Sequence, residues 1–285
     1  MAKTILITGA NGQVGHEFQY LSKASDFNFI FVDIAELDIT DNAAVLNFFR
    51  NKNIDFCVNC AAYTAVDKAE SEPEIAEKVN VTGAKNLAEG CALKDIPLIH
   101  LSTDYVYHNQ QNTPFKEHDE TNPQGVYAKT KLDGDEIALK TNPKTIILRT
   151  SWVYSSYGKN FVKTMLRLGP ERDELTVIFD QIGTPTYARD IAKSILEILP
   201  SLEQKSPGIY HLSNEGVTSW YDFAVAIFDL KGIECRVKPI ETKDYPTPAK
   251  RPHFSLLNKA KIKADFGLEI PHWRESLRDC LELLD

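Results

Sequence analysis

A run of three glycines near the start of the chain constrains its fold more than any other feature. Gly9, Gly12 and Gly15 follow the apolar segment 4–8, and a pattern typical of a helix begins at Val14. The first glycine permits a tight turn, the second admits backbone N–H groups close to a phosphate, and the third lets helix and strand pack closely. The positive helix end then faces the anion. We predict a nucleotide pyrophosphate site here, with an ordinary strand-to-helix turn as the alternative.

Apolar segments that we expect to be strands alternate with helical patterns through the first half of the chain. These segments are 4–8, 29–32, 56–61, 98–102 and 145–149. Strands separated by helices are typical of right-handed βαβ units, which build a parallel sheet covered on both faces. We therefore predict the α/β class, with a Rossmann-type doubly wound parallel sheet in an NAD(P)-binding domain at residues 1–150.

The alternation is lost after about residue 150. Prolines become frequent there, and the segment 220–230 has a helical pattern. We predict a smaller, irregular α/β substrate-binding lobe over most of residues 151–285, in a chain that can cross back to the first domain. Ligands of open α/β sheets bind beyond the carboxyl ends of the strands, so a lobe placed there would close a cleft over the cofactor.

Composition excludes several classes of function. The chain has 285 residues, of which 43% are hydrophobic, and a net charge of −8. Nucleic-acid binding requires a basic surface, so we expect no nucleic-acid partner. No apolar run is long enough to span a bilayer, and a strand begins almost directly after Met1, which leaves no room for a signal peptide. We expect a soluble, cytoplasmic protein with no membrane partner.

Two of the five cysteines, Cys57 and Cys60, form a CxxC pattern. They fall in a segment that we expect to be a buried strand, where an odd separation directs two side chains to opposite faces. We therefore interpret them as small core residues rather than as a redox or zinc site.

Acidic residues follow the second predicted strand. Asp33 stands at its end, where a carboxylate can accept hydrogen bonds from the adenosine ribose and repel a 2′-phosphate. This favours NADH, with NADPH as the alternative cofactor. The Asp38 carboxylate lies where it could flank the edge of an adenine, and Ile39 lies where its apolar side chain could cover the ring. Thr40 or Asp41 could equally be a helix N-cap.

Tyr127 and Lys131 are four residues apart in a helical pattern, so they share a helix face. A lysine cation near a tyrosine favours the phenolate, which would bring the phenolic proton into the catalytic range. The fourth predicted strand ends nearby in Ser102, Thr103 and Asp104. These residues offer two hydroxyls and a carboxylate at the edge of the sheet, although Ser102 and Thr103 could simply form a turn.

These motifs together resemble the extended short-chain dehydrogenases and reductases. Within that superfamily, five segments are similar to the dTDP-4-dehydrorhamnose reductases, and the similarity runs nearly end to end. The segments are 65–73, 102–107, 149–154, 160–167 and 245–252. The resemblance implies reduction of the C4 ketone of dTDP-4-dehydro-L-rhamnose to dTDP-L-rhamnose, with a dTDP-sugar as the substrate partner.

The resemblance also implies roles for individual residues. Tyr127 would donate a proton to the developing alkoxide, Lys131 would hold the nicotinamide ribose and lower the pKa of the tyrosine, and Thr103 would hydrogen-bond the carbonyl oxygen. The residues expected around the cofactor are Gly9, Gly12, Gln13, Val14, Gly15, Asp33, Asp38, Ile39, Ala62, Tyr63, Thr64, Leu101, Tyr127 and Lys131. Those expected at the nucleotide sugar are Thr64, Val66, Asp104, Tyr105 and Trp152, the last of which could instead be a core aromatic.

The chain departs from the family pattern at three positions. Family members often have asparagine two residues before the catalytic tyrosine and glycine directly after it, where this chain has Gly125 and Ala128. Some members carry a glutamate, where this chain has Arg189, that helps to hold a dimer through a magnesium ion. Although Glu17 matches another ligand of that ion, Arg189 does not fit such a site. We therefore predict no metal site and leave a homodimer open.

Other functions are also compatible with a sequence of this kind. The chain could be another nucleotide-sugar 4-keto reductase or epimerase, or a non-catalytic subunit resembling the regulatory subunit of methionine adenosyltransferase. The presence of Thr103, Tyr127 and Lys131 favours an enzyme. A dehydratase is disfavoured because Asp104 is followed by Tyr105 and not by the glutamate that elimination of water requires.

Overall fold

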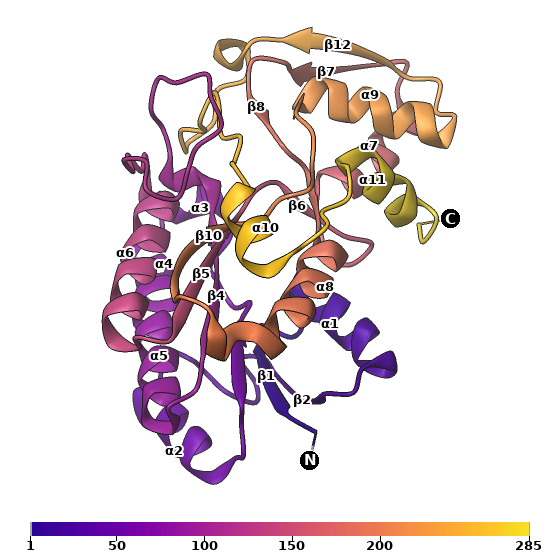
Figure 1. The fold of residues 1–285 in the computed structure, drawn as a ribbon. Helices are drawn as coiled ribbons and strands as arrows, with labels where there is room; N and C mark the ends of the chain where they lie inside the picture. The colour runs from indigo at the N-terminus through magenta and orange to yellow at the C-terminus, as the bar shows by residue number, and fades with distance from the viewer. Residues whose placement is uncertain (1, 285) are drawn as a thin grey trace.

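The computed structural model describes residues 2–284, apart from the side chains of residues 203 and 204, and is organised in two lobes (Figure 1). The larger lobe is built on a six-stranded sheet in which every neighbouring pair is parallel. In spatial order its strands are β10 (Gly208–His211), β5 (Thr145–Thr150), β4 (Leu98–Thr103), β3 (Phe56–Asn59), β1 (Thr4–Thr8) and β2 (Asn28–Val32). This confirms the predicted fold class.

The central strands are buried on both faces, as the strands of a parallel sheet usually are. Successive residues of β1 alternate between the two sides: Ile5 and Ile7 pack in one apolar cluster and Leu6 in the other. The five predicted strands agree with β1 to β5 to within one or two residues at each end. Strand β10 was not predicted, because four residues after a proline give too short a pattern to identify.

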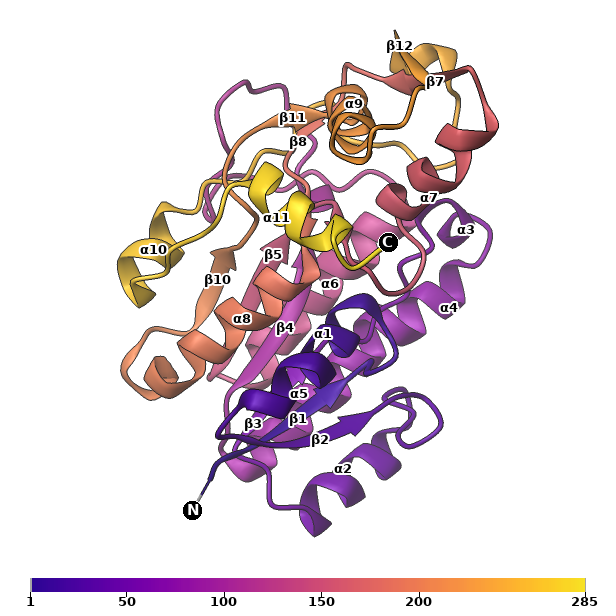
Figure 2. The same cartoon turned by 90° about the vertical axis from the view of Figure 1, so that its right-hand side faces the viewer.

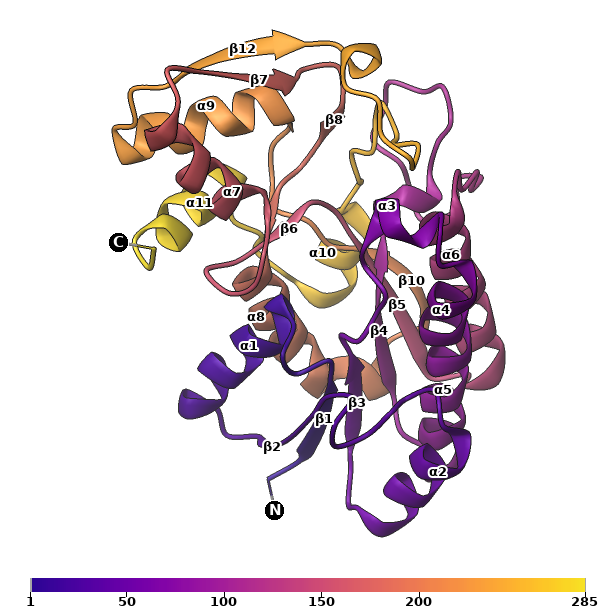
Figure 3. The ribbon, with the colours of Figure 1, turned by 180° about the vertical axis from the view of Figure 1, so that it is seen from behind.

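Helices cover both faces of this sheet. One face is packed by α1 (Gln13–Leu21) and α8 (Ala188–Ile198), which lie side by side in Figure 2. The other face is packed by α2 (Asn42–Asn51), α5 (Gly83–Lys94) and α6 (Val126–Thr141), which Figure 3 shows along one side of the molecule.

Shorter helices complete the connections of the larger lobe. Between β3 and α5 the chain forms α3 (Val66–Ala69), α4 (Pro73–Glu77) and a π-helical turn at Lys78–Thr82. The late helix α10 (Ala260–Phe266) contacts β10 and adds Ile262 to the apolar core beside α8.

The smaller lobe lies beyond the carboxyl ends of the central strands (Figure 1). It has its own apolar core between helices and three two-stranded pairs. The helices are α7 (Phe161–Leu168), α9 (Trp220–Lys231) and α11 (Trp273–Leu281). The pairs are β6 (Val153–Tyr154) with β9 (Thr186–Tyr187), β7 (Glu174–Ile178) with β12 (Arg236–Ile240), and β8 (Ile182–Gly183) with β11 (Thr218–Ser219).

The chain passes between the lobes more than once. After β6, α7, β7, β8 and β9 it returns to the larger lobe, where α8 packs on α1 and β10 pairs with β5. The domain boundary that we predicted at residue 150 stays a prediction. Within residues 2–284 we find no helix with the length and apolar character needed to cross a membrane.

Candidate active site

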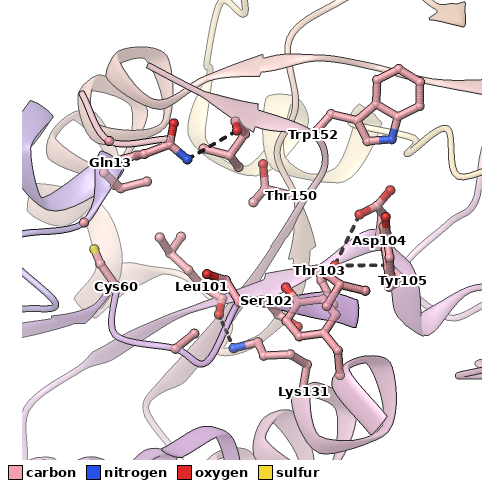
Figure 4. Close-up of a pocket in the computed structure, with 18 of the residues that line it drawn as sticks. Gln13, Cys60, Leu101, Ser102, Thr103, Asp104, Tyr105, Lys131, Thr150 and Trp152 are labelled. Carbon is pink, nitrogen blue, oxygen red and sulfur yellow. Dashed lines mark hydrogen bonds between the residues drawn. The ribbon is translucent and has the colours of Figure 1, made fainter. Parts of the chain in front are cut away.

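A cavity of about 540 Å³ lies where the carboxyl ends of β1, β3, β4 and β5 meet the smaller lobe (Figure 4). Figure 4 shows Gln13 and Cys60 at one end of it and Asp104 and Trp152 at the other. The predicted site residues that line it are Gly12, Gln13, Val14, Ala62, Thr64, Val66, Leu101, Thr103, Asp104, Tyr105, Tyr127, Lys131 and Trp152. The fold therefore brings together residues from both lobes.

The glycine loop has the close packing that its sequence predicts. Gly9 has a φ of +65°, and a Cβ atom there would lie 2.6 Å from the backbone nitrogen of Ala61. A Cβ on Gly15 would lie 2.4 Å from the carbonyl oxygen of Gly9. Gly12 caps α1 without a side-chain hydrogen bond, so the N–H groups of the first turn are available to an anion.

Asp33 supports this loop from outside the cavity lining. Its carboxylate accepts hydrogen bonds from the backbone N–H groups of Asn11, at 2.9 Å, and Ile34, at 2.8 Å. The carboxylate at the end of β2 is thus tied to the turn that begins α1. Its contact with a ribose stays a prediction.

The other residues expected near the adenine also lie outside the cavity lining. Asp38 accepts hydrogen bonds from the backbone N–H and the hydroxyl of Thr40, which lower the pKa of its carboxyl. Asp41 caps α2 by accepting from the N–H of Ala44, so one alternative assigned from the sequence is confirmed. Buried Ile39 packs against Gly83 at the start of α5.

Tyr63 is not among the residues that line the cavity and is held by two hydrogen bonds. Its hydroxyl donates to the Glu72 carboxylate at 2.6 Å, and its backbone N–H donates to the Asn80 side chain at 2.8 Å. The expected contacts of Tyr63, Asp38 and Ile39 with a cofactor stay predictions.

The three expected catalytic side chains line one cavity. Thr103 is the last residue of β4 and lies within 3.2 Å of the Asp104 carboxylate, to which its hydroxyl donates. Tyr127 and Lys131 lie one turn apart in α6, and the lysine ammonium donates to the carbonyl oxygen of Leu101 at 2.7 Å. The ring of Tyr127 meets that of Tyr105 edge-on.

The pKa values of Tyr127 and Lys131 are both shifted by burial. Burial raises the pKa of Tyr127 to about 12, although a hydrogen bond with Thr103 opposes this change. Burial also lowers the pKa of Lys131 to about 8, against the attraction of Asp135. The pKa of Tyr127 is therefore shifted upward, whereas the sequence predicted a downward shift. Burial is the largest cause and the charges of Asp104 and Asp135 add to it, so Tyr127 is a protonated phenol at neutral pH, as a proton donor must be.

Asp104 is the second acid of the cavity. Burial raises the pKa of its carboxyl to about 7, while the hydroxyls of Ser255 and Thr103 partly oppose that effect. One of its carboxylate oxygens, Oδ2, has no hydrogen-bond partner. This acid is therefore able to change its charge near neutral pH.

The turn before Tyr127 explains one departure from the family pattern. Gly125 precedes α6 with a φ of +87°, a conformation that favours glycine. The Glu70 carboxylate accepts from the N–H of Val126 at 2.8 Å, and its oxygen would lie only 2.5 Å from a Cβ on Gly125. Ala128 is buried within α6.

An aromatic pair forms the wall toward the smaller lobe. Trp152 has a φ of +47°, and its ring stacks on Trp220 with centroids 3.7 Å apart and planes 7° from parallel. Trp152 therefore lines the cavity, and the alternative of a core aromatic is not what the structure shows. A Cβ on Gly183 would lie 2.8 Å from the Trp152 ring, so this glycine makes room for the stack.

Sequence reasoning did not assign several lining residues to the site. They are Asn11, Cys60, Thr150, Val153, Gly158, Lys159 and Trp220. Trp220 follows a capping Ser219 at the start of a helix in the other lobe, and no spacing links it to the motifs of residues 1–131. Asn11 could have been placed from the sequence, because it lies between Gly9 and Gly12 in the predicted loop, and Ser102, which was expected at the sheet edge, also lines the cavity.

The two cysteines of the CxxC pattern pack on opposite faces of the sheet, as predicted. Cys57 is buried in the apolar cluster on one face, and Cys60, just after the end of β3, packs against the cluster on the other face. Cys60 also lines the cavity, which the sequence did not indicate. Both cysteines are free thiols, and burial raises the pKa of Cys60.

Glu17 and Arg189 form an ion pair between α1 and the start of α8. The Arg189 guanidinium donates to the Glu17 carboxylate at 2.8 Å, and the Ser155 hydroxyl donates to its other oxygen at 2.7 Å. Glu17 is completely buried. In the described part of the chain no three side chains of the metal-ligating types gather into a site.

A second cavity of about 590 Å³ shares Trp220 with the first. It is lined mainly by α7, β7 and the segment that precedes α10. Arg251 and Asp67 both line it and form an ion pair of 2.7 Å, which holds the pKa of the Asp67 carboxyl below its usual range. Arg172 lines the same cavity.

The arrangement of the first cavity defines a class of protein. A glycine loop opens α1, a hydroxyl stands at the end of β4, and α6 carries a tyrosine and a lysine one turn apart, as in the extended short-chain dehydrogenases and reductases. The match to a family model is more specific. The chain belongs to the family described as "RmlD substrate binding domain", whose model matches residues 3–285.

Individual relatives agree with this family over their full lengths. A dTDP-4-dehydrorhamnose reductase of Aggregatibacter actinomycetemcomitans is 42% identical, over 96% of this chain and 97% of its own. The crystal structure of a dTDP-4-dehydrorhamnose reductase from Clostridium acetobutylicum is 44% identical, with a TM-score of 0.95 and 99% of each chain covered. The enzyme of the same name from Bacillus anthracis, solved in complex with NADP, is 35% identical, with a TM-score of 0.95 over 99% of each chain.

Proposed function

We propose that this protein reduces the C4 ketone of dTDP-4-dehydro-L-rhamnose to dTDP-L-rhamnose with NADH or NADPH. The observation that best supports this proposal is that Thr103, Tyr127 and Lys131 line one cavity beside the glycine loop in a member of this family. The substrate is inferred from the relatives, which are named dTDP-4-dehydrorhamnose reductases.

The glycine loop fits a dinucleotide. The uncapped first turn of α1 offers N–H groups and the positive end of the helix to a pyrophosphate, and the packing around Gly9 and Gly15 leaves no space for side chains. The nicotinamide supplies the hydride when it is bound. Because the B. anthracis relative was solved with NADP, both forms of the cofactor are candidates.

The side chains supply the proton and the orientation. Tyr127 is the proton donor to the developing alkoxide, since its phenol keeps its proton at neutral pH. When substrate is bound, the Thr103 hydroxyl would turn from Asp104 to donate its hydrogen bond to the carbonyl oxygen, and so stabilise the charge that develops there. Lys131 is held in place by the Leu101 carbonyl and binds the nicotinamide ribose.

The two cavities can hold the two parts of the substrate. We propose that the sugar lies against Asp104, Tyr105 and Trp152 in the first cavity, while the dTDP group extends past Trp220 into the second. Arg172 and Arg251 are the cations of the second cavity that could attract the diphosphate. The dTDP-sugar is the only partner this function requires, although a homodimer is compatible with it, and we place the reaction in the cytoplasm.

The decisive experiment mixes the purified protein with dTDP-4-dehydro-L-rhamnose and NADH or NADPH, and follows both nicotinamide absorbance and the sugar product. Formation of dTDP-L-rhamnose supports the proposal. Turnover only with another 4-keto sugar nucleotide would identify a different reductase of the class. No turnover, together with co-purification of a methionine adenosyltransferase, would identify a regulatory subunit.

A further inference from the structure

A buried histidine behind Lys131 has no role in the reaction as described so far. His100 lies in β4, two residues before Ser102, and is 1% exposed. Its ring contacts Asn59 of β3 on one side and Lys131 of α6 on the other. The hydrogen bonds around these three residues determine where the ring carries its proton.

The orientation of the Asn59 amide is determined by its neighbours. Its oxygen Oδ1 accepts from the backbone N–H of Ala61 at 3.0 Å and from the hydroxyl of Thr8 at 2.7 Å. A backbone N–H can only donate, so Oδ1 cannot exchange places with the amide nitrogen. The Nδ2 group of Asn59 must therefore point toward Nδ1 of His100, 2.9 Å away.

This contact determines the tautomer of His100. Because Asn59 Nδ2 donates, Nδ1 of the ring must accept, and the single proton of a neutral imidazole is on Nε2. Burial lowers the pKa of His100 well below its ordinary value, and the charge of Lys131 lowers it further, so the ring is neutral. The Nε2–H group then faces Nζ of Lys131 at 3.1 Å.

Lys131 meets this donor differently in its two forms. A neutral amine has a lone pair that accepts the Nε2–H hydrogen, whereas an ammonium presents only its own hydrogens to it. We propose that His100 is a positioning residue that favours the neutral amine of Lys131 by donating a hydrogen bond from Nε2. This inference rests on the proposed function only in the step from the charge of Lys131 to cofactor binding.

The other charged groups around Lys131 act in the opposite direction or not at all. Asp135, one turn further along α6, stabilises the ammonium, but its oxygen Oδ1 lies 3.9 Å from His100 Nε2 and has no hydrogen-bond partner. The other oxygen of Asp135 accepts from Ser102 of β4 and from Arg149 of β5. The attraction of Asp135 is smaller than the effect of burial, so the pKa of Lys131 is lowered on balance. Tyr127, on the same face of α6, is uncharged at neutral pH.

The test uses the protein without cofactor, so it does not depend on the reaction. Lysine labelled with carbon-13 at Cε is incorporated, and Lys131→Arg identifies the Lys131 signal by its loss. In the wild type we expect this signal to titrate near pH 8, well below a free lysine at about 10.4. In Asn59→Asp the new carboxylate accepts from Nδ1–H, so Nε2 becomes an acceptor for the ammonium. The midpoint should then move upward by about 1 pH unit or more.

Thr8→Val is the matched control. It removes a hydroxyl from the same buried network but leaves the N–H of Ala61 to orient Asn59, so the midpoint of Lys131 should stay in place. If Asn59→Asp does not fold, His100→Gln replaces it, because the glutamine amide oxygen can accept from the ammonium and should also raise the midpoint. A Lys131 midpoint that is ordinary in the wild type, or that is unchanged in Asn59→Asp or in the His100→Gln variant that replaces it, would overturn the proposal.

A second measurement connects the histidine to the reaction. If the ammonium of Lys131 binds the nicotinamide ribose, kcat/KM for NADH should fall above about pH 8 in the wild type. The alkaline limb should move to higher pH in Asn59→Asp and stay unchanged in Thr8→Val. A shifted titration of Lys131 without a shifted limb would leave the role of His100 standing and contradict the ribose-binding role of Lys131.

Discussion

At the scale of single residues, burial decides the charges in the active site. Tyr127 keeps its proton, Lys131 can lose its proton near pH 8, and Asp104 changes charge near pH 7. Desolvation penalises every charged form, so it moves the pKa values of Lys131 and Asp104 toward neutral pH and that of Tyr127 further above it. The cavity therefore holds a neutral acid where a ketone needs a proton.

The role of Tyr127 is testable by removing only its hydroxyl. Tyr127→Phe keeps the ring that packs against Tyr105, so the binding of NADH should be nearly unchanged. Turnover should fall about a hundredfold or more, because a general acid is lost. Steady-state kinetics and fluorescence titration with NADH measure the two effects. Undiminished turnover would show that another group donates the proton.

Asp33 combines two functions that substitutions can separate. Its carboxylate supports the glycine loop through Asn11 and would also repel a 2′-phosphate. Asp33→Asn keeps an oxygen for the N–H of Asn11 and removes the charge, so the ratio of kcat/KM for NADPH to that for NADH should rise.

Asp33→Ala removes both the charge and the loop contact, and it should weaken the binding of both cofactors as well. The sequence-based prediction of NADH as the better cofactor depends on the same measurement. A wild type that prefers NADPH, or a ratio unchanged in Asp33→Asn, would show that Asp33 serves only the loop.

At the scale of elements, the start of α9 positions an aromatic wall of the site. Ser219 and Asp222 form a capping box, with the Ser219 hydroxyl accepting from the N–H of Asp222 and the Asp222 carboxylate accepting from the backbone of Ser219. The next residue after the cap is Trp220, which stacks on Trp152. The direction of a helix start thus determines where an active-site side chain lies.

Ser219→Ala tests this link between a helix cap and substrate binding. Loss of the cap should cost about 1 kcal/mol of stability. It should also raise KM for the sugar nucleotide, because Trp220 loses its defined position. Asp41→Ala, which removes the cap of α2 away from the cavity, is the control and should lower stability by a similar amount with KM unchanged. A KM that is unchanged from the wild type in Ser219→Ala as well would contradict the proposed role of the Trp152 and Trp220 pair.

At the scale of the whole molecule, a buried ion pair joins segments that are far apart in the sequence. Glu17 and Arg189 are separated by 172 residues, and their pair holds α1, which follows the glycine loop, against α8. Arg189 also stacks over the rings of Tyr20 and Tyr187. A guanidinium thus neutralises the buried carboxylate of Glu17 within the chain itself.

Breaking this pair should affect stability more than chemistry. Arg189→Met leaves Glu17 buried without a cation, which should cost about 3–5 kcal/mol and lower the thermal midpoint. Arg189→Met combined with Glu17→Gln should recover part of this loss. A chelator should leave both the thermal midpoint and the turnover of the wild type unchanged. A large effect of the chelator would show that a metal ion stabilises the protein in spite of the ion pair.

The sequence by itself determined the fold class and the position of the cofactor loop. Both depend on local patterns: apolar segments of strand length, helical spacing, and glycines where backbone atoms approach within van der Waals distance. The pairing of Tyr127 with Lys131 is local as well, since residues four apart share a helix face. Such features were predicted because they need no knowledge of distant contacts.

Only the tertiary structure decided the rest. The edge strand β10, the stacked Trp220, the cavity position of Cys60 and the pair of Glu17 with Arg189 depend on residues that meet across long distances in the sequence. The reversed prediction for the pKa of Tyr127 has the same origin. The free energy of a charge is determined by how much solvent and which hydrogen-bond partners surround it, and those surroundings exist only after the chain has folded.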